Sequence, residues 1–377
     1  MRNLPRWVGV DTLEYEMIEV DLYRRRAVLS LGALAFSFSC ASTPTAPTNT
    51  AQPSVNSGAA SAPSSTANTA PGALKKPGEN PFLNAAWYVD KYSSVFGHAN
   101  ALRKEHPADA ALLDKIAKYG GADWIGEWTA FVGDWVKRRN RDATKQGALP
   151  IYIAYNLPNR DCGQYSQGGV KSGDAYRKWI EDFARGIGDT KTVIVLEPDA
   201  LGQLTKCLAE KDQKERLDLL RFAIKTFNAL PRAYVYLDGG HSKWMSVEEA
   251  TDRLKAAGVD EAQGFSLNVS NYRGTEELIE YGKKISANLG GKHFVIDTSR
   301  NGNGPPVVAD PSSEDNWCNP PGRALGSPPT TQTADPLCDA YLWLKKPGES
   351  DGACSGGPKA GLWYNERALE LSRNAKF

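Results

Sequence analysis

Apolar residues recur in two alternating patterns from about residue 80 to the C-terminus. Short runs rich in β-branched and aromatic residues predict strands at 151–156, 192–198, 233–239, 264–269, 293–298 and 340–345. Between most of them the apolar residues follow the helical period, and the segment 174–187 places Tyr176, Trp179, Ile180, Phe183 and Ile187 on one face. Strands and helices in alternation predict a parallel sheet, either closed into a barrel or doubly wound.

The turns after the strands decide between these two folds. A doubly wound dinucleotide-binding sheet carries G-x-G-x-x-G after a strand, and no such motif follows the first runs. Segment 246–258 begins with a Ser246/Glu249 capping pattern and ends at Gly258, which predicts a helix between strands. We therefore expect an α/β fold of the barrel type, with parallel strands in a single catalytic domain.

Aspartates stand at or just after the carboxyl ends of most predicted strands. They are Asp161, Asp199, Asp238, Asp297 and Asp351. Because the loops at these ends gather on one face of a parallel barrel, we expect several of the carboxylates to share one site. Taken singly, each has an ordinary alternative, since Asp is common at turns and Asp199 also suits the start of a helix.

Composition narrows the chemistry of such a site. The 377 residues carry a net charge of +1, which gives no reason to expect a nucleic acid or an anionic membrane as the main partner. The histidines, His98, His106, His241 and His293, lack metal-ligand spacing, and we expect neither a metal nor another cofactor. Carboxylic acids gathered among many aromatic rings favour glycoside hydrolysis, in which one acid protonates the leaving oxygen and a carboxylate activates water. A carboxylate–metal hydrolase on the same barrel is an alternative.

The first 78 residues differ from the rest. Residues 24–39 join three arginines to a short apolar run, which predicts an export signal within 1–40, either of twin-arginine type or starting at Met17. Residues 41–78, rich in Ala, Ser, Thr and Pro, predict a disordered tether, and 79–377 the catalytic domain. Cys40 is similar to the acylated cysteine of bacterial lipoproteins, although Ser37 departs from that motif. The exported chain is therefore either anchored through Cys40 to the outside of the bacterial cell membrane or released.

Six stretches of the chain, in order, resemble the motifs of glycoside hydrolase family 6, the inverting cellulases. They are YNLPNRDCGQYSQGG, VIVLEPDAL, YLDGGHSKW, GFSLNVSNY, WCNPPGRALG and LWLKKPGESDGACSGGPKAGLWYNE. The resemblance covers about residues 80–377. It implies a distorted, partly open TIM-like β/α barrel that hydrolyses β-1,4-glucans with inversion at the anomeric carbon.

The resemblance also implies roles for individual side chains. Asp199 matches the family's general acid, and Asp161 matches the neighbour that tunes this acid and helps to move protons from the attacking water. Asp351 matches the usual candidate for catalytic base, a role disputed within the family, and Asp238 matches an aspartate that binds sugar and supports catalysis. The expected sugar contacts are Tyr155, Lys345 and Glu349 at the cleavage point, His241 and Trp244 on the leaving side, Trp87 and Trp317 on the non-leaving side, and Asn268.

Four other tryptophans are expected to be core residues. Trp124, Trp128 and Trp135 recur at helical spacings, and Trp363 stands among helix-forming residues. The position of the water-positioning residue stays open, because Gln167, with Ser166 beside it, stands where the family often has a serine.

The cysteines fit an exported protein. The resemblance pairs Cys162 with Cys207 and Cys318 with Cys354, so that each bridge fastens a loop that carries an acid. Cys338 has no family partner and is expected to be a buried free thiol.

Loop lengths favour attack at internal bonds of the polymer. The loop after Cys162 reaches helical sequence by Asp174, and only SGGPKAG separates Cys354 from LWYNE, so neither loop is long enough to roof a glucan chain. We expect a monomeric endoglucanase with β-1,4-glucan as its partner. The alternatives are an exo-acting cellobiohydrolase, in which the Pro-rich segment 318–338 covers one end of the site, and a non-catalytic carbohydrate-binding protein.

Overall fold

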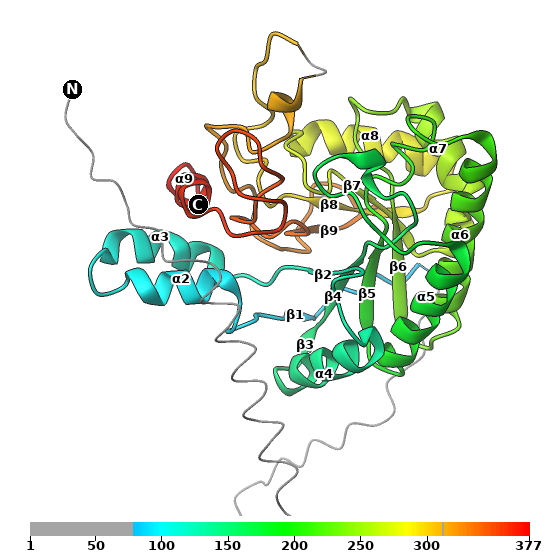
Figure 1. Ribbon diagram of the computed structural model, residues 1–377, viewed down its shortest axis with the longest axis horizontal. Helices are drawn as coiled ribbons and strands as arrows, with labels where there is room; N and C mark the ends of the chain where they lie inside the picture. The colour runs from blue at the N-terminus through cyan, green and yellow to red at the C-terminus, as the bar shows by residue number, and fades with distance from the viewer. Residues whose placement is uncertain (1–77, 311–312) are drawn as a thin grey trace, which may run out of the picture. The chain divides into compact units, whose positions relative to one another are not determined.

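The computed structural model describes residues 78–310 and 313–377 (Figure 1). The predicted export signal at 1–40, the acylation alternative at Cys40 and all but the last residue of the tether lie outside the described residues. Within the described part, no helix is long and apolar enough to cross a membrane.

Seven parallel strands form one curled sheet in the order β2-β4-β5-β6-β7-β8-β9. Trp124 Nε1, at one edge, donates a hydrogen bond to Leu344 O beyond the other edge over 2.9 Å, but no ladder joins the two edges within the described residues. The predicted fold, a distorted and partly open parallel barrel, is confirmed. The strands of this sheet are β2 (Asp123–Ile125), β4 (Ile151–Ala154), β5 (Thr192–Leu196), β6 (Ala233–Asp238), β7 (Gly264–Leu267), β8 (His293–Asp297) and β9 (Cys338–Leu342), and a separate parallel pair joins β1 (Ala86–Trp87) to β3 (Ala148–Leu149).

The helices of the described residues are α2 Ser94–Leu102, α3 Pro107–Ala117, α4 Val132–Lys145, α5 Gly173–Ile187, α6 Glu210–Asn228, α7 Val247–Ala256, α8 Thr275–Asn288 and α9 Asn365–Arg373. Of these, α4 to α8 pack on the outer face of the sheet (Figure 1). Neighbouring strand residues serve two cores, since Ile194 packs under the helices while Val195 packs with Tyr236 inside the curl. Burial on both faces explains why the strands read as continuous apolar runs.

The segment 174–187 is confirmed as a helix, α5, and the Ser172 hydroxyl caps it by accepting a hydrogen bond from Ala175 N over 3.2 Å. At α7, Ser246 accepts from Glu249 N over 3.0 Å, as its capping pattern predicts. A smaller apolar cluster joins α2 and α3 to α9 and includes Trp343.

The helical spacing of Trp124, Trp128 and Trp135 is not realised. Trp124 lies on β2, Trp135 lies on α4, and Trp128 lies on the loop between them with 54% of its surface exposed. The expectation of a core position is therefore wrong for Trp128, although Trp135 packs against the outer core and Trp363 packs against the cluster of α2, α3 and α9. A strand of three residues is too short to show a period, which is why β2 escaped the pattern analysis.

Candidate active site

Four of the five strand-end aspartates meet at the carboxyl end of the sheet. Asp199 follows β5 and Asp238 ends β6, and the charges of Asp161, Asp238 and Asp351 all act on the carboxyl group of Asp199. The fifth, Asp297, accepts hydrogen bonds from four backbone amides in the loops after β7, β8 and β9, so its carboxylate holds these loops together. The predicted gathering of carboxylates is therefore confirmed for four of them.

Asp199 lies in a strained turn among other acids. Its φ of +70° and the φ of +49° at Glu197 are left-handed values that cost about 1–3 kcal/mol each in a non-glycine residue. Burial raises the pKa of Asp199 well above its ordinary value, and the charges of Asp238 and Asp161 raise it further. Tyr155 opposes this rise by donating its hydroxyl to Asp199 Oδ2 over 3.3 Å. Among the described residues, no arginine or lysine forms an ion pair with Asp199.

Asp238 is a fixed neighbour of Asp199. Its Oδ2 accepts hydrogen bonds from Asp199 N at 3.1 Å and Gly240 N at 3.2 Å, and its Oδ1 accepts from the Ser266 hydroxyl at 3.2 Å. Burial raises the pKa of Asp238 to about 7, and these donors oppose the rise. Since donors favour the ionised form, they make Asp238 the more readily ionised of the two carboxyl groups.

Asp161 lies on the opposite loop, after β4. Ser166 N donates to its Oδ2 over 2.7 Å and Gln203 Nε2 donates to its Oδ1 over 2.9 Å. Burial raises the pKa of Asp161, although both donors lower it. The Cys162–Cys207 disulfide anchors the loop beside it.

Sequence analysis missed the groups that hold this loop. Arg160 is buried and donates to the Glu127 carboxylate over 2.5 Å and 2.9 Å, to Tyr155 O over 2.7 Å and to Ser166 O over 2.8 Å. Glu197 is buried as well, and its carboxylate accepts hydrogen bonds from two backbone amides of the same loop and from a tyrosine hydroxyl of α5. The R-D-C and L-E-P motifs contain both residues, but only the fold shows that they fix the position of Asp161 relative to Asp199.

Asp351 has the opposite surroundings. Its Oδ2 accepts hydrogen bonds from Arg300 at 2.8 Å, Asn319 N at 3.0 Å and the Tyr272 hydroxyl at 3.1 Å, and Lys345 Nζ lies 3.7 Å from Oδ1. Burial alone would raise the pKa of Asp351, but the charges of Arg300 and Lys345 outweigh it and hold the pKa below its ordinary value. Asp351 is therefore ionised, and its Oδ2 is fully engaged.

Aromatic and charged side chains extend from Asp199 toward β2 and β9. Tyr155 meets Trp124 edge to face with ring centroids 5.1 Å apart, and Lys345 Nζ lies 5.9 Å from the centroid of the Trp124 ring. Trp124 is thus an interior residue beside the site, which the sequence analysis assigned to a helical core. Trp124 lies on β2 next to the outward-directed Asp123, and this strand of three residues is too short to show an alternating pattern in the sequence.

His241 and Trp244 lie together on the loop after β6. Their ring centroids are 5.7 Å apart, and Trp244 packs so closely over Gly202 that a Cβ there would meet its ring at 2.6 Å. Burial and the nearby Arg273 lower the pKa of His241 to about 4. The imidazole is therefore neutral above mildly acidic pH.

Of the remaining predicted sugar contacts, Trp87 and Trp317 are half-buried, whereas Asn268 is fully buried. Trp87 packs beside Phe82, with ring centroids 5.8 Å apart, and Trp317 lies 6.1 Å from the Tyr165 ring. Asn268 is fully buried; its Nδ2 donates to Asp297 O over 2.8 Å and its Oδ1 accepts from a backbone amide over 3.0 Å. The expectation that Asn268 contacts sugar is therefore wrong, because its amide is used to build the loop.

The water-positioning alternatives, Ser166 and Gln167, both lie on the Asp161 loop. Ser166 contacts Asp161 through its backbone N, and the side-chain oxygen of Gln167 lies near Gly163. Neither residue is singled out by this geometry.

The predicted disulfides are present, at Cys162–Cys207 and Cys318–Cys354. Cys338 is a buried free cysteine, as expected, and burial raises the pKa of its thiol. Within the described part of the chain, no group of three or more His, Cys, Asp or Glu side chains is arranged to hold a metal ion.

Known proteins resemble this chain over the same region. The model of glycosyl hydrolases family 6 matches residues 82–375. Endoglucanase A of Cellulomonas fimi is 43% identical over 303 residues, which are 79% of this chain and 63% of that protein. Endoglucanase 1 of Streptomyces halstedii is 39% identical over 301 residues, which are 77% of this chain and 89% of that protein.

A solved endoglucanase structure is also similar to this chain. The endoglucanase Cel6 of Mycobacterium tuberculosis, in complex with a thio-linked methyl cellobiosyl cellobioside, is 44% identical with a TM-score of 0.73, and the match covers 78% of this chain and 99% of that chain. The matched region of this chain covers only 63% of the length of endoglucanase A of Cellulomonas fimi.

Proposed function

Because this chain belongs to glycosyl hydrolases family 6, we propose that it is an inverting endo-β-1,4-glucanase that cuts internal bonds of cellulose or a related β-glucan. The observation that carries the proposal is the placement of Asp199, a carboxylic acid among other acids and without a cation in ion-pair contact. Such an acid keeps its proton at a pH where an ordinary aspartate has lost it.

Asp199 then acts as the general acid. It donates its proton to the glycosidic oxygen as the bond to the leaving sugar breaks, so that the leaving group departs as a neutral alcohol. The charges of Asp238 and Asp161 raise the pKa of Asp199, and Tyr155 orients its carboxyl group.

Water must attack the anomeric carbon from the other face, and a carboxylate must accept its proton. Asp351 is a poor acceptor, because a proton on its carboxyl group would weaken its ion pairs with Arg300 and Lys345. Asp161 receives only neutral donors, and burial already raises the pKa of its carboxyl group. We therefore assign proton acceptance to Asp161, with Ser166 or Gln167 placing the water.

The surrounding side chains place the sugars. Tyr155 and Trp124 offer rings beside Asp199, and Lys345 offers hydrogen-bond donors there. His241 and Trp244 form the contact surface on the leaving side, with a neutral imidazole that suits sugar hydroxyls. Glu349 contacts the sugar at the cleavage point, and Trp87 and Trp317 are the contacts on the non-leaving side.

One assay tests the mode of attack. We expect the viscosity of carboxymethylcellulose to fall steeply at low release of reducing sugar, and the earliest products to be α-anomers by proton NMR. Cellobiose release with little change in viscosity would indicate an exo-acting enzyme. A β-anomer as the first product would contradict inversion.

Export is part of the proposal, supported by the two disulfides and the signal-like residues 24–39. We propose a monomer outside the cell, either released or anchored through Cys40. Substitution Cys40→Ala distinguishes the two, because it moves the enzyme from the membrane fraction to the medium only if the cysteine is acylated.

A further inference from the structure

Trp128, expected from the sequence to be a core residue, lies on the loop after β2 with 54% of its surface exposed and contacts the buried Arg160. The guanidinium carbon of Arg160 is 5.1 Å from the centroid of the Trp128 ring and 4.5 Å from the centroid of the Tyr155 ring. At distances below ~6 Å, an aromatic face attracts a cation. One arginine therefore joins an exposed ring to the tyrosine that donates to Asp199.

The loop that carries Trp128 is built closely around this cation. Glu127, the preceding residue, accepts two hydrogen bonds from Arg160, at 2.5 Å and 2.9 Å. Two glycines make the packing possible. A Cβ at Gly126 would meet the Trp128 ring at 2.5 Å, and a Cβ at Gly168 would overlap the Glu127 carboxylate and the guanidinium. The ring and the carboxylate thus hold the same cation from one loop.

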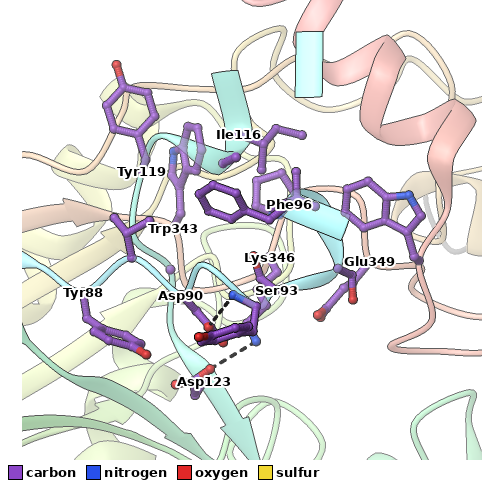
Figure 2. Close-up of a pocket in the computed structure, with 18 residues that line it drawn as sticks. Tyr88, Asp90, Ser93, Phe96, Ile116, Tyr119, Asp123, Trp343, Lys346 and Glu349 are labelled. Atoms are coloured by element: carbon purple, nitrogen blue, oxygen red, sulfur yellow. Dashed lines mark hydrogen bonds and ion pairs between the residues drawn. The ribbon is translucent and has the colours of Figure 1, made fainter. Parts of the chain in front are cut away.

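This loop begins at a fixed point, because β2 is tied to the segment after β9. Asp123, the first residue of β2, pairs with Lys346 at 3.2 Å (Figure 2) and with Arg139 at 2.9 Å. Trp124, the next residue, donates from Nε1 to Leu344 O over 2.9 Å. The loop is therefore positioned by the barrel, although the tryptophan ring that it carries is exposed to solvent.

Arg160 contacts the backbone beside both groups that move protons in the proposed reaction. Its Nε donates to Ser166 O over 2.8 Å, and Ser166 N in turn donates to Asp161 Oδ2 over 2.7 Å. Its Nη1 donates to Tyr155 O over 2.7 Å, and the Tyr155 hydroxyl donates to Asp199 Oδ2 over 3.3 Å. The guanidinium thus supports the loop of the proton acceptor and the tyrosine that orients the proton donor.

We propose that Trp128 is a positioning residue, which holds the Arg160 guanidinium in place together with Glu127. Through Arg160 it orients Asp161 and Tyr155 for the reaction. The inference rests on the proposed function and adds to it a residue that touches neither the sugar nor the transferred proton. Without the ring, water reaches the guanidinium and the cation gains room to move, so its hydrogen bonds to the loop backbone weaken.

Three substitutions in the full-length chain test this role by kinetics. Trp128→Ala removes the ring, Trp128→Phe keeps a smaller one, and Phe131→Ala is the matched control, an 82% exposed ring on the same loop. With cellopentaose as substrate, we expect Trp128→Ala to lower kcat about three- to tenfold and to leave KM within about twofold, because the ring acts on positioning and not on binding. Trp128→Phe should restore most of the lost kcat, and Phe131→Ala should change neither constant.

The titration of Asp161 gives a readout that does not depend on activity. Burial raises the pKa of Asp161, and two hydrogen-bond donors and the charges of Arg160 and Lys206 lower it. A loosened Arg160 lowers it less, while Lys206 and the neighbouring acid Asp199 are unchanged. The pKa of Asp161 should therefore rise in Trp128→Ala by about 0.5 to 1 unit, measured by carbon-13 NMR of the aspartate carboxyl groups and assigned with Asp161→Asn. Because Asp161 accepts a proton only while ionised, the acid limb of kcat/KM should move to higher pH as well.

An Asp161 titration in Trp128→Ala equal to that in Phe131→Ala overturns the positioning role, even if glucans are hydrolysed. A rise in KM with kcat retained also overturns it, because the ring then binds sugar directly. If Trp128→Ala does not fold, the same measurements on Trp128→Phe decide, with smaller changes expected in the same directions. A raised pKa of Asp161 in a chain that hydrolyses no glucan supports the positioning role and overturns the proposed activity.

Discussion

Asp199 and Asp351 lie on the same face of the same sheet, yet their surroundings are opposite. Asp199 is surrounded by Asp238 and Asp161, and its pKa is raised. Asp351 is held by Arg300 and Lys345, and its pKa is lowered. Burial raises the pKa of both carboxyl groups, so the charges of the neighbours decide the difference. A carboxylate without a cation keeps a proton that it can give away, whereas one with two cations serves to hold its loop.

The buried arginine beside each acid is used differently. Beside Asp161 and Asp199 the buried cation Arg160 donates to Glu127 and to backbone oxygens and forms no ion pair with either acid among the described residues, although its charge lowers the pKa of Asp161. Around Asp351 the buried cation Arg300 is directed to the acid itself. The fold thus uses one arginine to place a reactive loop without neutralising it and another to neutralise a carboxylate.

The largest expected effect comes from removing the proton donor. Asp199→Ala should lower the rate on unactivated glucans by about 10²- to 10⁴-fold or more, because no acid remains to protonate the leaving oxygen. The rate on a β-cellobioside with a dinitrophenolate leaving group should fall much less, because this leaving group departs without a proton. Circular dichroism should show an unchanged fold. Full activity of this variant on cellulose would remove Asp199 from the role of acid.

Removing Asp351 should mainly lower the stability of the fold. Asp351→Ala leaves Arg300 and Lys345 buried without their partner, which costs about 3–5 kcal/mol of unfolding free energy. Urea denaturation measures this loss. The matched control is Asp174→Ala, an exposed member of a surface ion pair, which should change the stability by at most about 1 kcal/mol. If Asp351→Ala is as stable as the wild type but inactive, Asp351 belongs to the chemistry and the contrast drawn above is wrong.

The two disulfides allow the loops to be compared directly. Replacing Cys162 and Cys207 with serine, or Cys318 and Cys354, should cost about 2–4 kcal/mol in either case, because the separations of 45 and 36 residues are similar. We expect the first pair to lower kcat more, since its loop carries Asp161. Equal kcat in both variants would show that Arg160 and Glu197 hold the Asp161 loop without the bridge.

A smaller effect should appear in the pH profile. A general acid is active while protonated, so activity is lost as the pH rises through its pKa. The charge of Asp238 raises the pKa of Asp199, and Asp238→Asn removes that charge. The basic limb of kcat/KM should therefore move to lower pH, by about 0.5 to 1 unit. With Asp174→Asn, the control, the limb should stay in place. A shift to higher pH after Asp238→Asn would contradict the charge coupling.

Much of the fold could be predicted from the sequence because it depends on repeated local patterns. Six of the seven strands of the main sheet and the helix α5 have enough residues to show a period, while β2, with three residues, does not. The helical spacing of Trp124 and Trp128 is not realised, because Trp124 lies on β2 and Trp128 on the loop that follows, but Trp124 packs against the inner core, as expected. The α2–α3 hairpin packs with α9 and Trp343 in a small separate cluster, and these partners are distant in sequence, so its place in the fold could not be predicted.

The candidate site could be predicted as a set of acids, but their protonation could not. Position at a strand end identifies Asp161, Asp199, Asp238 and Asp351 alike, whereas the pKa of each depends on partners distant in sequence. Arg300 lies 51 residues from Asp351, and Asp238 lies 39 residues from Asp199. Asn268 is the opposite case. Its motif predicts a contact with sugar, but its side chain is buried and hydrogen-bonded to the backbone of the loops.

Direct observation of the two carboxyl groups tests the central contrast best. Carbon-13 NMR of the full-length chain labelled at the aspartate carboxyl carbons, with Asp199→Asn and Asp351→Asn to assign the two signals, follows each titration. The account predicts that Asp199 remains protonated well above pH ~4, the ordinary aspartate value, and that Asp351 remains ionised below it. Titration of Asp199 at or below the ordinary value, or of Asp351 above it, would contradict the account.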